Sequence, residues 1–414
     1  MSIGKIRYMK KQSNTPEIRF QNYEDKWDIE KLINIFATIR NAFVGTATPY
    51  YVEEGKFYLE SNNVKNGKIN YNSQIFINDE FYEKQRDKWL KTNDIVMVQS
   101  GHVGHTAVIP EELNNTAAHA LIVFTDYKKE VNPHFLNYQF QSNGKRKKLD
   151  LISTGNTIKH ILASEMKDFK MDFPTFEEQT AIGSLFRTLD DLLASYKDNL
   201  ANYQSLKATM LSKMFPKAGQ TVPEIRLDGF EGEWEIKRAD EIFKSVSEKN
   251  RALLPVLSAS QIDGMVLRDE IGIDIKYDEA TLNNYKLVKP GQFVIHLRSF
   301  QGGFALSKLE GITSPAYTII DFIDKVNNLP DFWNSILTSR DFIKRLETVT
   351  YGIRDGKSIS FKDFSSLRFV FPEFKEQQAI GSYFSNLDQL ITSYQEKISQ
   401  LETLKKKLLQ DMFI

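Results

Sequence analysis

Apolar residues recur every seven positions in two long segments of the chain. One series begins at Ile182 and the other at Ile380, and each has further apolar residues four positions after its members. This spacing is that of the a and d seam of a coiled coil, so each segment is predicted to be a long helix that needs a partner. The predicted seam residues are Ile182, Phe186, Leu189, Leu193, Tyr196, Leu200, Ile380, Phe384, Leu387, Ile391, Tyr394 and Ile398.

The two segments are copies of one sequence. Phe173-Pro-Thr-Phe-Glu-Glu-Gln-Thr-Ala-Ile-Gly leads into the first helix, and Phe371-Pro-Glu-Phe-Lys-Glu-Gln-Gln-Ala-Ile-Gly leads into the second. The motif Pro-Glu-Ile-Arg also occurs twice, from Pro16 and from Pro223, and marks the start of each half. We therefore expect two similar halves whose helices pair with each other in antiparallel orientation. The alternative is that each helix packs only on its own domain.

The segments between the repeats have a different pattern. Short runs of β-branched and aromatic residues alternate there with Gly, Asn and Pro, which is typical of strands joined by turns. Two stretches within them, 133–141 and 331–339, are predicted to be helical. The fold class is therefore α+β: two α/β variable domains separated by two long repeated helices, with pseudo-two-fold symmetry. The predicted division is 1–172 (first domain), 173–216 (first helix), 217–370 (second domain) and 371–414 (second helix).

Composition adds few constraints. The chain has 414 residues, enough for two domains, and its 54 basic residues balance 54 acidic ones. Charge neutrality counts against a protein that grips DNA alone, because phosphate neutralisation drives non-specific affinity, but not against one whose partners supply backbone contacts. Cysteine is absent, which excludes disulfides and thiolate metal sites. No apolar run approaches the ~20 residues that span a bilayer, and no signal core is evident, so a cytoplasmic location is expected.

Three polar loops recur at comparable places in both halves. Their Arg and Lys side chains suit guanine edges, and their Asn and Gln side chains suit adenine edges. Any one of them alone would be read as ordinary turn chemistry; recurrence is what favours a DNA-binding role. The candidate residues in the first half are Asn63, Lys65, Gln99, Ser100, His102, His105, Thr106, Asn156, Thr157 and Lys159. Those in the second half are Gln261, Arg298, Ser299, Gln301, Tyr317, Arg354, Lys357 and Ser358.

The duplicated Pro-Glu-Ile-Arg and Phe-Pro signatures, followed by the heptad helix, resemble the specificity subunit of type I restriction-modification systems. The resemblance covers essentially the whole chain. It implies two target recognition domains, each reading one half of a bipartite site in double-stranded DNA. It further implies an antiparallel coiled coil that sets the gap between half-sites and docks two modification (methyltransferase) subunits, with ATP-dependent restriction subunits in the full complex.

No catalytic constellation is evident in the sequence. The segment from Gly352 to Ser358 is one residue short of a phosphate-binding loop, and Asn132-Pro-His-Phe lacks the glycine-rich loop that would accompany a methyltransferase motif. We expect a helix start at Asn132 and a polar loop, not a metal site, at His102 and His105. The chain is therefore interpreted as non-catalytic and without cofactors. The alternatives are a protein-binding scaffold or a specificity subunit of a related type IIB/IIG-like system.

Overall fold

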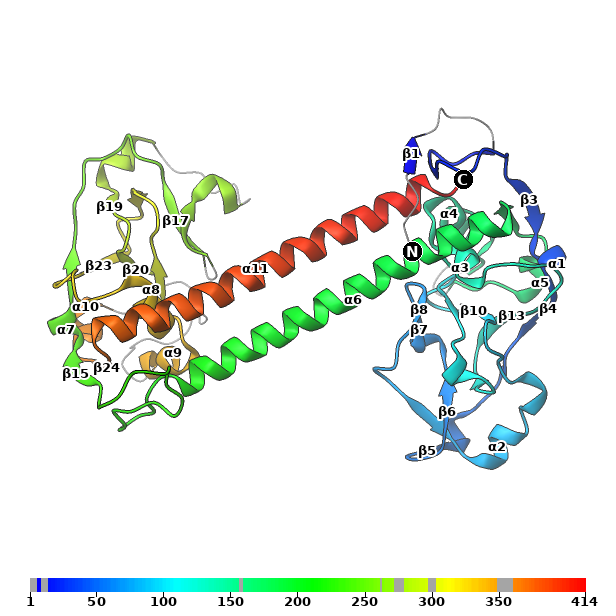
Figure 1. Cartoon of the computed structure of the whole chain (residues 1–414), viewed down its shortest axis with the longest axis horizontal. Coiled ribbons are helices and arrows are strands. Elements are labelled where there is room, and N and C mark those ends of the chain that lie inside the picture. The colour runs from blue at the N-terminus through cyan, green and yellow to red at the C-terminus, as the bar shows by residue number, and fades with distance from the viewer. Residues whose placement is uncertain are drawn as a thin grey trace. The chain divides into compact units, whose positions relative to one another are not determined.

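The computed structural model describes residues 6–8, 14–155, 159–260, 263–271, 279–296, 303–347 and 360–414. These residues form two compact units (Figure 1). Unit 1 contains residues 1–197 and 396–414, and unit 2 contains residues 198–395. Each unit therefore has one variable region, the first part of one repeated helix and the last part of the other.

Unit 1 is built from short strands with helices interspersed among them along the chain. Its largest sheet is antiparallel, in the order β11-β10-β13-β4, and a second four-stranded sheet has the order β12-β6-β9-β5. The strands are β1 (Ile6–Tyr8), β2 (Ile18–Phe20), β3 (Asp28–Lys31), β4 (Phe36–Asn41), β5 (Tyr51–Val52), β6 (Lys56–Leu59), β7 (Val64–Lys65), β8 (Lys68–Ile69), β9 (Ile75–Ile77), β10 (Ile95–Val98), β11 (Thr106–Val108), β12 (Ala117–Ala118), β13 (Leu121–Tyr127) and β14 (Lys170–Phe173). The helices are α1 (Leu32–Ile35), α2 (Asp79–Glu83), α3 (Pro133–Gln141), α4 (Asn143–Ile152), α5 (Ala163–Met166) and the beginning of α6 (Phe176–Lys213).

Unit 2 contains a sheet that matches the β11-β10-β13-β4 sheet of unit 1. Its antiparallel order, β21-β20-β23-β16, corresponds strand for strand to β11-β10-β13-β4. The strands are β15 (Glu235–Arg238), β16 (Phe243–Val246), β17 (Leu257–Ser260), β18 (Gly264–Leu267), β19 (Lys286–Val288), β20 (Phe293–Ile295), β21 (Phe304–Leu306), β22 (Gly311–Thr313), β23 (Thr318–Phe322) and β24 (Arg368–Phe371). The helices are α7 (Ala239–Ile242), α8 (Pro330–Leu337), α9 (Arg340–Glu347), α10 (Phe361–Ser365) and the beginning of α11 (Phe374–Asp411). The predicted α+β class and the two predicted short helices, which became α3 and α8, are confirmed.

The duplicated signatures meet in space within each unit. In unit 1, Arg19 of Pro-Glu-Ile-Arg donates two hydrogen bonds of 2.7 Å to the carboxylate of Glu178 at the start of α6. In unit 2, Arg226 and Glu376 form the same bidentate pair, at 2.8 and 2.7 Å. The arginine fork matches the two carboxylate oxygens, so each pair ties the beginning of a variable region to the beginning of a long helix.

The Gln and Gly of the helix signature have matching roles. The amide of Gln179 donates to the Pro174 carbonyl and accepts the N–H of Asn132, at the start of α3. Gln377 likewise joins Pro372 to the N–H of Leu329, at the start of α8. Gly183 lies so close to α3 that an added Cβ would be 2.8 Å from the side chain of Asn132. The signature therefore encodes the docking of a long helix on a short one.

The two long helices contact each other inside each unit, and the direction of the contacts is antiparallel. In unit 1, Asp190 and Lys197 of α6 pair with Lys405 and Glu402 of α11, each at 2.6 Å. In unit 2, Lys207 pairs with Asp388, and the rings of Tyr203 and Tyr394 are 5.4 Å apart. All twelve predicted seam residues are buried or half-buried.

The last residues of each helix enter a hydrophobic core. Phe413, just beyond α11, packs on Phe135 and Phe186 in unit 1, with ring centroids 5.6 and 5.7 Å apart. Phe215, just beyond α6, packs on Phe332 and Phe384 in unit 2, at 5.8 and 6.0 Å. Each core is therefore completed by residues from the other half of the sequence.

Candidate nucleic-acid interface

Three polar segments of unit 1 converge on one surface. They are the β7–β8 hairpin, the loop 99–105 between β10 and β11, and residues 159–161 between α4 and α5. The Ile161 N–H donates to the Gln99 carbonyl at 3.0 Å, and the Gly101 N–H donates to the Lys159 carbonyl at 3.2 Å. The Asn66 N–H of the hairpin donates to Nδ1 of His105 at 3.2 Å. Polar segments that are far apart in sequence thus form a continuous surface.

Cationic and polar side chains face solvent on this surface. Lys65, His102 and Lys159 are exposed, and Lys159 is paired with Asp150 at 3.2 Å. The half-buried Arg146 of α4 donates to Nδ1 of His105 at 3.2 Å. Such a surface fits phosphates and base edges, because lysine and arginine neutralise phosphates and contact guanine.

His105 is held in one protonation state. Its Nδ1 faces the Asn66 N–H and the Arg146 guanidinium, so this nitrogen acts as an acceptor. Burial, followed by the charge of Arg146, lowers the pKa of His105 to about 4. The imidazole is therefore neutral near pH 7, with its proton on Nε2, which leaves Nε2–H as a hydrogen-bond donor.

Two of the candidate residues support the loops from within. Asn63 is buried, and its amide donates to the carbonyls of Asn70 and Ser73 and accepts the N–H of Glu60. Thr106 is also buried and donates to the Asn137 side chain at 2.7 Å. Neither side chain is presented to a ligand, contrary to the expectation that both contact DNA. The sequence shows that a residue is polar, but not whether its side chain is buried and stabilises the loop or is exposed and can contact DNA.

Gln99 and Ser100 are half-buried at the edge of the same surface. Both are joined through their backbones to the segment around His160. Sequence reasoning missed Asn66 and Arg146, although Arg146 lies in the basic run Lys145–Lys148. That run was a usable signal, because clustered basic residues are typical of nucleic-acid contacts.

The corresponding surface of unit 2 is described only in part. Tyr317 is half-buried, and its carbonyl accepts a hydrogen bond from Lys286 at 2.7 Å. The ring of His296, at the end of β20, lies 6.2 Å from the Tyr317 ring, and burial lowers the pKa of His296. The remaining candidates lie outside the described residues: Asn156 and Thr157 of the first half, and Gln261, Arg298, Ser299, Gln301, Arg354, Lys357 and Ser358 of the second.

The enzyme-like motifs have structural roles where they are described. Asn132 caps α3 by accepting the Phe135 N–H at 3.1 Å, and Pro133 occupies the first turn, as the predicted helix start requires. The segment from Gly352 to Ser358 lies outside the described residues. Within the described ranges, no group of three or more His, Asp or Glu side chains is arranged to hold a metal ion. None of the helices in those ranges is long and apolar enough to cross a membrane.

Comparison with known proteins points to a single family. Residues 50–202, which include all three converging segments, match the family model for the type I restriction modification DNA specificity domain. The putative type I restriction enzyme MjaX specificity subunit of Methanocaldococcus jannaschii is 21% identical, and the match covers 96% of this chain and 95% of that protein. Residues 50–202 thus match a type I DNA specificity domain, and the chain as a whole is similar to type I specificity subunits. The MjaVIII specificity subunit of the same organism is also 21% identical, over the same shares of the two chains.

The fold of the chain is also similar to that of a solved structure. The crystal structure of the type I restriction-modification system S subunit from M. genitalium aligns with a TM-score of 0.62. The alignment covers 97% of this chain and 99% of that one, at 16% identity. At this identity the likeness concerns the fold, and the roles of individual residues must be argued from the contacts described above.

Proposed function

We propose that this chain is a sequence-specific DNA-recognition subunit in which each variable region reads one half of a bipartite site. The observation that carries the proposal is the convergence of the β7–β8 hairpin, the loop 99–105 and residues 159–161 on one cationic surface. This surface lies within the segment that matches the DNA specificity domain. The subunit forms and breaks no covalent bond itself. It directs modification subunits, and restriction subunits in the full complex, to the chosen sequence.

The chemistry of the surface fits this role. Lys65 is suited to phosphates or guanine, as is Lys159 once it leaves its exposed pair with Asp150, and the amide of Gln99 fits adenine. The Nε2–H of His105 is a donor suited to purine N7, guanine O6 or thymine O4. The balance of 54 basic and 54 acidic residues implies that much of the backbone contact comes from other subunits.

We further propose that the paired helices set the gap between the half-sites and dock two modification subunits. Besides the buried seam, each helix carries two exposed leucines in equivalent positions: Leu192 and Leu206 on α6, and Leu390 and Leu404 on α11. Single exposed leucines are common on protein surfaces, but this set recurs with the repeat. Each unit has one leucine from each helix, which supports two equivalent docking surfaces.

The test is to express the chain with its candidate modification subunit and to determine which adenines in host DNA become methylated. We expect a bipartite motif that depends on this chain. Lys65→Gln should relax sequence selection in one half-site and leave the other unchanged. Insertion of seven residues into both helices should change only the gap. If no bipartite motif depends on the chain, the proposed function is wrong, and a protein-binding scaffold becomes the better interpretation.

A further inference from the structure

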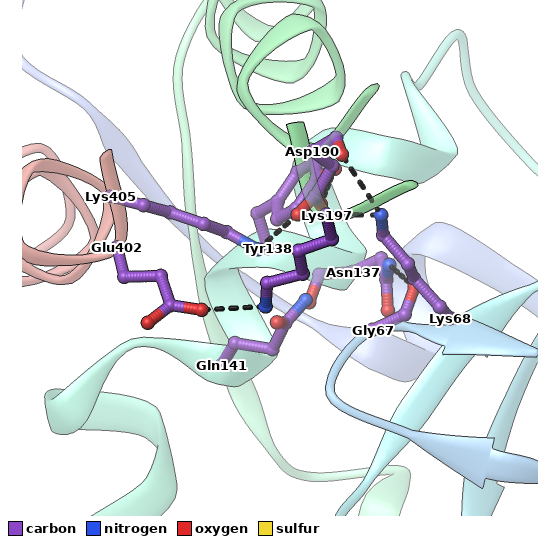
Figure 2. A network of polar contacts seen from close by, with 9 residues as sticks. All are labelled: Gly67, Lys68, Asn137, Tyr138, Gln141, Asp190, Lys197, Glu402 and Lys405. Atoms are coloured by element: carbon purple, nitrogen blue, oxygen red, sulfur yellow. Dashed lines mark hydrogen bonds and ion pairs between the residues drawn. The ribbon is translucent and has the colours of Figure 1, made fainter. Parts of the chain in front are cut away.

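Asp190 of α6 connects three other elements of unit 1 (Figure 2). Its Oδ1 accepts a hydrogen bond from Lys405 of α11 at 2.6 Å, and its Oδ2 accepts one from the hydroxyl of Tyr138 of α3 at 2.7 Å. The ammonium of Lys68, in β8, lies 3.5 Å from Oδ1 and 3.4 Å from the Asp190 carbonyl. The Asp190 side chain is only 8% exposed, so these groups are its main source of polar stabilisation.

Lys68 belongs to the hairpin that forms part of the candidate interface. The neighbouring Gly67 carbonyl accepts a hydrogen bond from Asn137 of α3 at 2.9 Å, as Figure 2 also shows. Asn66, at the tip, donates to His105. Three successive residues therefore hold the hairpin in place. Asn66 contacts the loop 99–105, Gly67 contacts α3, and Lys68 contacts α6. Lys65 is carried on the same two-stranded hairpin.

The matching position of unit 2 has a single ion pair where the chain is described. Asp388 is the repeat equivalent of Asp190, and it pairs with Lys207, the equivalent of Lys405. There the side chains are 53% and 31% exposed, and Lys207 is the only partner of Asp388 among the residues that the structure describes. The equivalent Asp–Lys pairs of the two copies therefore differ. In unit 1 the aspartate is buried and has several partners, whereas in unit 2 it is exposed and pairs with one lysine.

We propose that Asp190 is a positioning residue for recognition of one half-site, because it links the final turns of α11 to the β7–β8 hairpin. This inference rests on the proposed function. Lys405 pairs with the buried Asp190 carboxylate, and the same carboxylate attracts Lys68 and so restrains the hairpin that presents Lys65. Residues near the end of the chain thereby influence a surface formed near its beginning. Within the described part of unit 2, Asp388 makes no such connection to the second variable region.

Asp190→Asn tests the inference, and Asp388→Asn is the matched control. Asparagine keeps the size of the side chain but removes the charge that attracts both lysines. In the free protein, backbone amides of residues 64–69 should exchange with solvent about two- to five-fold faster in Asp190→Asn, the range expected for loss of a partly exposed ion pair. They should be unchanged in Asp388→Asn. Lys68→Gln, which leaves the helix contact intact, should also accelerate the exchange and covers the case in which Asp190→Asn folds poorly.

Methylation mapping completes the experiment. Asp190→Asn should weaken base selection in one half-site several-fold, whereas Asp388→Asn should leave both half-sites as in the unmodified chain. If the hairpin exchanges at the wild-type rate in both Asp190→Asn and Lys68→Gln, the inference is overturned even where the bipartite motif is found. Equal effects of Asp190→Asn and Asp388→Asn on the hairpin would also overturn it. If the unmodified chain directs no bipartite methylation, the proposed function fails, whatever the exchange rates show.

Discussion

Replacing Glu178 by Gln should destabilise unit 1 strongly. The Glu178 side chain is 1% exposed and Arg19 is 2% exposed, so neither charge is solvated by water. The carboxylate accepts both hydrogen bonds of the Arg19 fork and a third, at 3.2 Å, from Trp27. Glutamine has the same shape but leaves the arginine as a buried, uncompensated cation. Breaking a buried pair in this way costs about 3–5 kcal/mol.

The same substitution at Glu376 should cost less. Its partner Arg226 is 16% exposed and also donates to the carbonyls of Gly232 and Glu231. After Glu376→Gln, the guanidinium keeps those hydrogen bonds and some contact with water. The expected loss is that of a hydrogen bond to a charged group, about 1.5–3 kcal/mol.

Hydrogen exchange measured by mass spectrometry at increasing urea concentration can follow the two units separately, which matters because a two-unit chain need not unfold in one transition. Asp168→Asn is the control in unit 1, since its pair with Lys31 is exposed to solvent and should contribute little to stability. The argument from burial is refuted if Glu178→Gln destabilises unit 1 no more than Asp168→Asn. A larger effect of Glu376→Gln on unit 2 would equally contradict it.

Two further predictions concern the effect of pH on unit 1 and the buried tryptophans Trp27 and Trp234. Burial lowers the pKa of both His105 and His134 from 6.5 to about 4. Between these values the unfolded chain binds protons that the folded chain does not. Unit 1 should therefore lose stability as the pH falls from about 6.5 to 4. In His134→Gln, the unfolding free energy of unit 1, measured by urea titration, should depend less on pH. An unchanged pH dependence would contradict the lowered pKa of His134. Trp27→Phe should cost about 1–2 kcal/mol more than Trp234→Phe, because Trp27 donates to a carboxylate whereas the buried Nε1 of Trp234 has no acceptor among the described residues. Equal losses in unfolding free energy would show that the hydrogen bond to Glu178 contributes nothing.

Much of the architecture could be predicted from local pattern. The heptads predicted two long helices, and Pro133 with Asn132 marked the beginning of α3, because seam spacing and capping chemistry depend on residues close in sequence. The candidate interface was harder to predict. Asn63 and Lys65 are two residues apart and both polar, yet Asn63 is buried under the loop and Lys65 faces solvent. Arg146 was missed because it comes from a helix rather than from one of the polar loops.

The sequence by itself determined that the chain is duplicated, that each half is α+β, and that its helices need partners, because each of these conclusions follows from periodicity and repetition. Only the tertiary structure decided which contacts the residues of each copy make. It joined Arg19 to Glu178 and Arg226 to Glu376, and it completed each core with the end of the other half's helix. It also buried Asp190 among several polar partners, whereas its copy, Asp388, is exposed at the surface. Burial and electrostatics depend on neighbours that lie far away in the chain, so two identical motifs acquire different environments only when the chain folds.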